Sequence, residues 1–152
     1  MAAISNFNRR QESVGTNLHA PAQKKYFDGR VLIVEDHDDT RLMLRTMLEW
    51  RGVSVVEAAD GEAAVSMAET CRPDLIFMDG SLPSLDGLTA TRRIRQLDGT
   101  REVPIIFISG HAMSTAQAAA FDAGCDGYLV KPIDFAEWNR VLERYLPQRA
   151  QH

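Results

Sequence analysis

Short apolar runs alternate with amphipathic segments along most of the chain, from about residue 30 to residue 147. The apolar runs hold four to seven residues, a length typical of buried strands, and the segments between them repeat apolar residues at helical spacing. The pattern predicts strands over residues 31–34, 53–58, 74–79, 103–109 and 127–130. It predicts helices over residues 38–52, 60–70, 86–97, 114–124 and 134–146.

Polar residues and glycines mark the predicted helix ends. Short polar side chains accept hydrogen bonds from the free N–H groups of a first helical turn, and glycine readily takes the left-handed conformation that ends a helix. The predicted signals are N-caps at Asp38 and Asp60, capping boxes at Ser114–Gln117 and Asp134–Glu137, and terminating glycines at Gly52 and Gly124.

Strict alternation of strands and helices predicts an α/β fold. The strand segments are nearly all apolar, as expected when helices cover both faces of a sheet. Short connections imply right-handed crossovers and an open, doubly wound, five-stranded parallel sheet with five helices. The last helix carries an apolar stripe that is expected to face the core, formed by Phe135, Trp138, Val141, Leu142 and Tyr145.

Composition is that of an ordinary globular domain, with 152 residues, 45% hydrophobic and 25% charged. The formal charge of −4 gives no general electrostatic reason to bind nucleic acid. No apolar run approaches membrane-spanning length and no signal-peptide core is visible, so we expect a cytoplasmic protein without a membrane partner. Cys71 and Cys125 match no metal or redox spacing, and we interpret them as inert small hydrophobic residues.

Both ends of the chain differ from the patterned region. Residues 1–28 are rich in Asn, Gln, Ser, Ala and basic residues and show no sustained period. We expect residues 1–28 to form a flexible N-terminal tail, residues 29–148 the folded domain and residues 149–152 a short C-terminal tail.

Reactive side chains stand where the predicted strands end. In chain order they are Glu35 and Asp36 after the first strand, Asp79 after the third, Ser109 after the fourth and Lys131 after the fifth. Ligands of open α/β sheets bind in the crevice beyond the carboxyl ends of the strands, so these side chains are expected to converge.

The chemistry that suits such a cluster is narrow. Three close carboxylates repel one another and favour a bound cation, and hard oxygen ligands suit Mg²⁺. A hydroxyl and an ammonium suit the oxygens of an incoming phosphoryl group. Aspartate is a known covalent nucleophile that forms an acyl phosphate.

Each residue also has a plainer interpretation. Asp79 by itself reads as a turn residue that ends a strand, and Glu35 with Asp36 could begin a loop. Lys131 alone could be a solvated charge. Tyr128 could simply pack in a strand, and His111 could be a surface residue without a role. The joint placement of the strand-end residues, rather than any single one, favours function.

Four sequence blocks resemble the receiver domain of two-component response regulators. They are VLIVEDHDD, PDLIFMDGSLPSLDG, PIIFISGHA and GYLVKP. The spacing of 30 residues from Asp79 to Ser109, and of 22 from Ser109 to Lys131, makes the resemblance specific. It covers roughly residues 30–147 and implies the flavodoxin-like strand order 2-1-3-4-5 known from a chemotaxis receiver.

The resemblance implies roles for the acidic residues. Asp79 would accept a phosphoryl group from a phosphohistidine on a sensor kinase or a phosphotransfer protein. Asp36, Asp79 and the backbone carbonyl of Ser81 would hold Mg²⁺, with Mn²⁺ as the alternative ion. Glu35, where aspartate is frequent in the family, would act through a metal-bound water.

It also implies roles for residues around the acids. Lys131 would pair with the phosphoryl charge, and the peptide bond before Pro132 would be cis. Ser109, in place of an equally familiar threonine, and Tyr128 match the switch pair of the family. Gly80, Ser81 and His111 occupy modulator positions, which in the family affect phosphoryl lifetime or access.

The leading hypothesis is therefore a single-domain phosphoacceptor switch, not an enzyme acting on other substrates. Its output would be protein binding through the surface of the fourth helix, fifth strand and fifth helix, as a monomer or weak dimer. The alternatives are a relay shuttle that passes the group to another histidine, a metal-dependent aspartyl phosphatase, and a docking module independent of phosphorylation. Ser81 argues against the phosphatase, because such enzymes often carry an acid two residues after the nucleophile.

Overall fold

Residues 24–150 are described by a computed structural model, in which five strands alternate with five helices. The strands are β1 (Arg30–Val34), β2 (Ser54–Ala58), β3 (Leu75–Asp79), β4 (Ile105–Ser109) and β5 (Gly127–Val130). The helices are α1 (Asp38–Glu49), α2 (Gly61–Cys71), α3 (Gly87–Gln96), α4 (Ser114–Ala123) and α5 (Phe135–Tyr145). The elements and their order agree with those predicted from the sequence.

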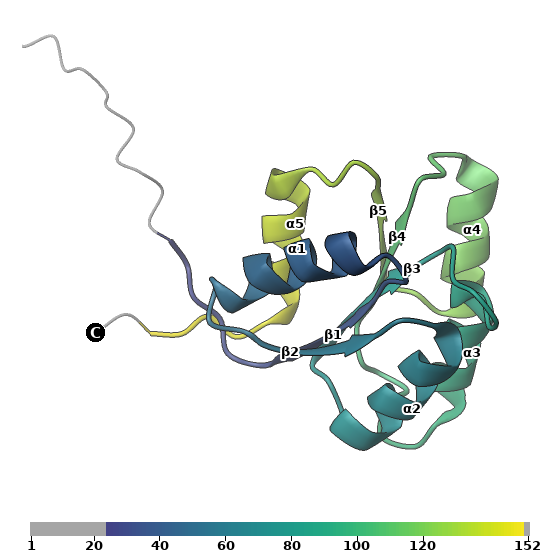
Figure 1. The fold of residues 1–152 in the computed structure, drawn as a ribbon, viewed down its shortest axis with the longest axis horizontal. Helices are drawn as coiled ribbons and strands as arrows, with labels where there is room; N and C mark the ends of the chain where they lie inside the picture. Colours follow the sequence, from purple (N-terminus) through teal and green to yellow (C-terminus); the bar gives the residue numbers. More distant parts are fainter. Residues whose placement is uncertain (1–23, 151–152) are drawn as a thin grey trace, which may run out of the picture.

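All neighbouring strands pair in parallel, in the order β2-β1-β3-β4-β5, which confirms the doubly wound fold. Helices α1 and α5 cover one face of the sheet, and α2, α3 and α4 cover the other (Figure 1). The three inner strands are nearly continuous apolar runs because both of their faces are buried.

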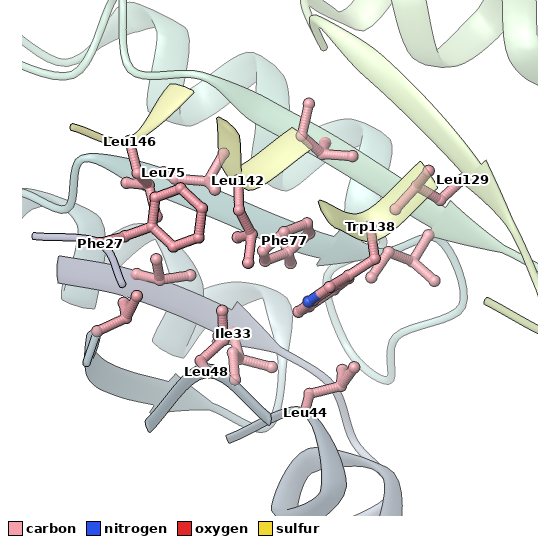
Figure 2. Packing of buried hydrophobic residues seen from close by; sticks show 14 residues of the cluster. Phe27, Ile33, Leu44, Leu48, Leu75, Phe77, Leu129, Trp138, Leu142 and Leu146 are labelled. Carbon is pink, nitrogen blue, oxygen red and sulfur yellow. The ribbon is translucent and has the colours of Figure 1, made fainter. Parts of the chain in front are cut away.

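Alternation along each strand divides the core into two layers. Val31 and Ile33 of β1 belong to the layer beneath α1 and α5, whereas Leu32 and Val34 belong to the layer beneath the other helices. The indole ring of Trp138 on α5 stacks on a β3 phenylalanine, Phe77, at 4.1 Å between ring centroids (Figure 2). This stack fixes α5 against the middle of the sheet.

The predicted stripe on α5 is largely confirmed, with one correction. Trp138 and Leu142 are fully buried, and Val141 and Tyr145 pack partly against them. Phe135 instead leaves 60% of its surface exposed, because it is the first residue of the helix and projects past the edge of the core.

The predicted start of α1 is wrong by one residue. The N-cap of α1 is His37 rather than Asp38, because the backbone N–H of His37 already donates to the Glu35 carboxylate and the turn closes one position earlier. Asp38 lies in the first helical turn and pairs instead with Arg41, 2.6 Å away. Acidic residues still suit this helix end, since its backbone dipole is positive there.

The capping box predicted at Ser114 is absent from the described structure. Met113 occupies the N-cap position with extended backbone, and Ser114 is the first helical residue, so its hydroxyl is one position too late to cap. The Gln117 side chain donates to the carbonyl of Ala112. Gly124 ends α4 at a φ of 111°, as predicted.

The predicted cap at Asp60 is present, and so is the Asp134 half of the capping box predicted at Asp134–Glu137. The Asp60 carboxylate accepts from the N–H of Ala63 at the start of α2. The Asp134 carboxylate accepts from the N–H groups of Ala136 and Glu137 at the start of α5. The first helix ends at Glu49, three residues before Gly52, whose positive φ of 83° belongs to the turn that follows.

The packed structure begins before residue 29. Phe27 has no exposed surface and joins the core layer beneath α1 and α5. Its backbone bridges to Gln148, and the guanidinium of Arg149 pairs with Asp28 at 2.7 Å. The chain segments on both sides of the domain are thus tied to each other. The rest of the predicted N-terminal tail, residues 1–23, and residues 151–152 lie outside the described residues.

Both cysteines are free thiols. Burial raises the pKa of the Cys125 thiol to about 11, so it stays protonated at neutral pH and behaves as a small apolar group. No helix within residues 24–150 is long and apolar enough to cross a bilayer.

Candidate functional site

The carboxyl ends of β1, β3, β4 and β5 bring the predicted site residues together. Asp79 is the last residue of β3 and Ser109 the last of β4, while Glu35 and Lys131 directly follow β1 and β5. Parallel strands in register end at one edge of the sheet, which makes this convergence a consequence of topology. The peptide bond between Lys131 and Pro132 is cis, as predicted.

A single ammonium group joins two of the acids. The Nζ atom of Lys131 lies 3.4 Å from Oε2 of Glu35 and 3.5 Å from Oδ1 of Asp79. The lysine is 96 and 52 residues away from these partners along the chain. Both carboxylates are almost wholly buried, with 2% and 3% of the side chains exposed.

Burial has an electrostatic consequence for Asp79. Loss of solvation, with a smaller effect of the nearby charge of Glu35, raises the pKa of its carboxyl from 3.8 to about 6. A hydrogen bond from the N–H of Ser81, at 3.1 Å, and the charge of Lys131 oppose this shift. With a pKa of about 6, this carboxyl is mostly ionised at neutral pH and can act as a nucleophile.

The acids and a histidine form a group suited to a cation. One ligand atom from each of Glu35, Asp36, His37 and Asp79 lies within 4.8 Å of every other. Oδ1 of Asp36 is buried and has no hydrogen-bond partner among residues 24–150. Such an orphaned oxygen is costly unless something positive binds it, and hard oxygen donors suit Mg²⁺.

His37 lies at the entrance to this group, with its side chain 72% exposed. Its Nδ1 atom is 3.0 Å from Oε1 of Glu35 and 3.1 Å from Oδ1 of Asp36. The hydrogen bond to Glu35 and the two negative charges raise the pKa of the imidazole above its ordinary value. Sequence reasoning did not single out this residue. The sequence feature that could have identified His37 as a site residue is its position, directly after two acids at a strand end.

Glycines allow the loop after Asp79 to fold closely. A Cβ atom at Gly87 would lie 2.5 Å from the Asp79 carbonyl oxygen, so only glycine lets α3 begin this near the acid. At Gly80 a Cβ atom would lie 3.3 Å from the ring of Phe107 and 3.4 Å from Oγ of Ser109. The loop that carries Ser81 is thus seated against β4.

Ser109 and Tyr128 meet through one loop residue. The backbone N–H of His111 donates to Oγ of Ser109 at 3.1 Å, and its carbonyl accepts from the Tyr128 hydroxyl at 2.7 Å. The Tyr128 ring lies 6.2 Å from the ring of Phe107 on β4. The imidazole of His111 is exposed, so this residue joins the network by its backbone.

Comparison with known proteins agrees with this geometry. The family model of the response regulator receiver domain matches residues 31–143. The chain is 32% identical over 116 residues to the polar-differentiation response regulator DivK of Brucella anthropi, an alignment that covers 76% of this chain and 94% of DivK.

Two solved structures share the fold. One is the receiver domain of the sensor histidine kinase PA1611 from Pseudomonas aeruginosa PAO1, which has a magnesium ion coordinated in its active site cleft. It is 40% identical, with a TM-score of 0.72, and the match covers 78% of this chain and 97% of that one. The other is a chain from the co-crystal of the Saccharomyces cerevisiae histidine phosphotransfer protein Ypd1 with the receiver domain of Ssk1, 27% identical, with a TM-score of 0.73, covering 79% and 90%.

The fold and the strand-end site define a phosphoacceptor module of two-component signalling. This chain belongs to the response regulator receiver domain family. Receiver domains pair with histidine kinases and phosphotransfer proteins, and they work as phosphoacceptor switches.

Proposed function

We propose that Asp79 accepts a phosphoryl group from a phosphohistidine on a sensor kinase or phosphotransfer protein, and that the modified chain signals by binding a downstream protein. The observation that carries the proposal is the contact of the Lys131 ammonium with the buried carboxylates of Asp79 and Glu35. Clustered buried acids are unfavourable for folding alone, so their retention beside one cation favours a chemical role.

In the proposed transfer, a carboxylate oxygen of Asp79 attacks the phosphorus atom of the donor. A P–O bond forms while the P–N bond to the donor imidazole breaks, and the electron pair leaves on the nitrogen. Lys131 offsets the negative charge on the phosphoryl oxygens, and the hydroxyl of Ser109 donates a hydrogen bond to one of them. Water later cleaves the acyl phosphate and restores the aspartate.

Asp36, Asp79 and the backbone carbonyl of Ser81 would hold Mg²⁺, with Glu35 acting through a water on the ion. When bound, the ion supplies positive charge that offsets the charge on the transferring group. Oδ1 of Asp36, which is buried and has no hydrogen-bond partner within the described part of the chain, supports this donor set.

The phosphodonor must reach Asp79 from outside, and an apolar groove lies beside the site. Its volume is about 310 Å³, and it is lined by Thr40, Met43, Met47, Lys131, Pro132, Ile133 and Phe135. Met43 and Phe135 are 47% and 60% exposed. We propose that a helix of the donor protein packs here, because the groove shares Lys131 with the acidic pocket.

The phosphorylated chain would bind its downstream partner through the surface of α4, β5 and α5. Tyr128 on β5 is bonded to the loop before α4, so a change at Ser109 can alter this surface. A cavity of about 240 Å³ between β5 and α5 is lined in part by Tyr128, Arg140 and Arg144. Met113 at the start of α4 and Phe121 within α4 are exposed, 68% and 47%. These features suit a protein partner.

The test is phosphorylation by acetyl phosphate with Mg²⁺, followed by intact mass and phosphate-affinity electrophoresis. The parent should gain one phosphoryl group, and Asp79→Asn should gain none. Asp98→Asn is the matched control, since the Asp98 side chain is 98% exposed and pairs with Arg101 on the surface. Undiminished labelling of Asp79→Asn would refute the assignment. Steady turnover of a phosphomonoester by the parent would instead favour the phosphatase.

A further inference from the structure

An imidazole nitrogen stands among the oxygen donors of the acidic pocket. Nδ1 of His37 lies 3.0 Å from a Glu35 oxygen and 3.1 Å from an Asp36 oxygen. The ring comes from the N-cap residue of α1, where its side chain makes no capping hydrogen bond. It is therefore oriented toward the acids and not toward the helix end.

These separations match neighbouring corners of an octahedral metal site. Metal–nitrogen and metal–oxygen bonds of about 2.1 Å at right angles place adjacent ligand atoms about 3.0 Å apart. The two measured separations at Nδ1 both lie at this value. One ion could thus contact the nitrogen and a carboxylate oxygen without displacement of either backbone.

A hydrogen bond explains only one of the two contacts. Nδ1 is hydrogen-bonded to Oε1 of Glu35. Oδ1 of Asp36 is equally near, yet it has no hydrogen-bond partner among the described residues and is buried. This nitrogen and this oxygen form an ion pair only when the imidazole is protonated, and a cation bound to both would hold a neutral imidazole at the same place.

We propose that His37 is a nitrogen ligand of the divalent ion in this pocket, with Asp36 as its oxygen neighbour. This inference rests on the proposed function, because it concerns the ion that serves Asp79. When the ion binds, Nδ1 would give up the proton that it donates to Glu35 and offer its lone pair, while Nε2 would keep its ring proton. Imidazole suits later first-row ions better than Mg²⁺. The pocket accordingly favours Co²⁺, Ni²⁺ and Zn²⁺ over Mg²⁺ more strongly than an all-oxygen pocket would.

The experiment compares the affinities of Co²⁺ and Mg²⁺ by calorimetry in the full chain and in His37→Ala. Removal of the nitrogen should weaken Co²⁺ binding roughly tenfold or more, as loss of even an indirect metal partner does. The Mg²⁺ affinity should change by less than about twofold, since Mg²⁺ prefers oxygen and water. His37→Gln should behave like His37→Ala, although its amide can still donate to Glu35.

A spectroscopic measurement separates ligation from a structural role. The Mn²⁺-loaded parent should show ¹⁴N modulation in pulsed electron paramagnetic resonance, and both His37 variants should lose it. His111→Ala is the matched histidine control, since its ring lies outside the metal-holding group, and it should keep the signal.

Equal weakening of Co²⁺ and Mg²⁺, or ¹⁴N modulation that survives in His37→Ala, would overturn the role of His37. Those results would not contradict the proposed phosphorylation of Asp79. Absence of any divalent-ion binding, together with no labelling of Asp79, would overturn the proposed function as well.

Discussion

The hydroxyl of Tyr128 donates a 2.7 Å hydrogen bond to the carbonyl oxygen of His111, 17 residues earlier in the chain. The N–H of the same His111 donates to Oγ of Ser109 at 3.1 Å. One loop residue therefore connects the hydroxyl beside the phosphoacceptor with the aromatic side chain of β5. A movement of either side chain must break or strain its bond to His111, to which the other side chain is also bonded.

Removal of the Tyr128 hydroxyl should loosen this loop. We expect Tyr128→Phe to lower the free energy of unfolding by about 1 kcal/mol, the usual contribution of one hydrogen bond. Amide exchange at residues 110–113 should become faster, while labelling of Asp79 stays within about twofold. Tyr145→Phe is the control, since the Tyr145 hydroxyl donates to no residue within 24–150. Unchanged exchange in the loop would contradict the coupling.

The buried acid Asp79 should make stability depend on pH when no metal is present. Its carboxyl has a folded-state pKa of about 6 against 3.8 ordinarily, mainly because burial disfavours the charge. The favourable contribution of the neutral form is thus complete below about 3.8 and is lost as pH rises through 6. At pH 8, ionisation of this carboxyl should lower the free energy of unfolding by about 3 kcal/mol, the equivalent of the pKa shift.

Urea unfolding in EDTA between pH 5 and pH 8 tests this. Asp79→Asn does not titrate, so its advantage in unfolding free energy over the parent should grow with pH across this range. Mg²⁺ should restore much of the parent's stability at pH 8, because the ion offsets the carboxylate charge. An advantage that is constant with pH would show that the carboxyl is not perturbed by burial.

Phe27 should be needed for folding, although the sequence pattern assigns it to a tail. Its ring is fully buried against the core layer of α1 and α5. We expect Phe27→Ala to lower the unfolding free energy by about 3 kcal/mol or more, as large-to-small core substitutions do. Tyr26→Ala, at a residue 38% exposed, should cost much less. Equal stability of the two variants would place Phe27 outside the core.

Arg95 should be a structural arginine that lysine cannot replace. Its guanidinium donates to the carbonyls of Thr100, Val103 and Gly124 and pairs with Asp126 at 2.7 Å. It thereby joins the end of α3 to the starts of β4 and β5. Lysine has no planar fork to satisfy these acceptors, so Arg95→Lys should lower the unfolding free energy by about 2 kcal/mol.

The matched control is Arg93→Lys on the same helix. Arg93 pairs with Glu62 on the surface, where both side chains are largely exposed, and the change should cost less than about 1 kcal/mol. Chemical denaturation of the two variants side by side measures the difference. Similar losses would mean that the Arg95 contacts add little stability.

Much of the fold was predictable because its signals are local. Helical spacing predicted that Leu142 faces the core, and the continuous apolar runs that hold Val31 and Phe77 predicted buried strands. Convergence of Glu35, Asp79 and Lys131 was also predictable, because parallel strands end at one edge. The caps at His37 and Met113 were missed because one residue of turn geometry decides them.

The sequence by itself thus determined the order of elements, the core faces and the edge where the reactive side chains gather. Only the tertiary structure decided which atoms meet there. It brought the Lys131 ammonium to two buried acids, and it packed Phe27 under α5. The physical reason is distance along the chain. Periodic patterns reflect interactions between residues that are close in sequence, whereas these contacts join distant segments that only packing brings within a few ångströms.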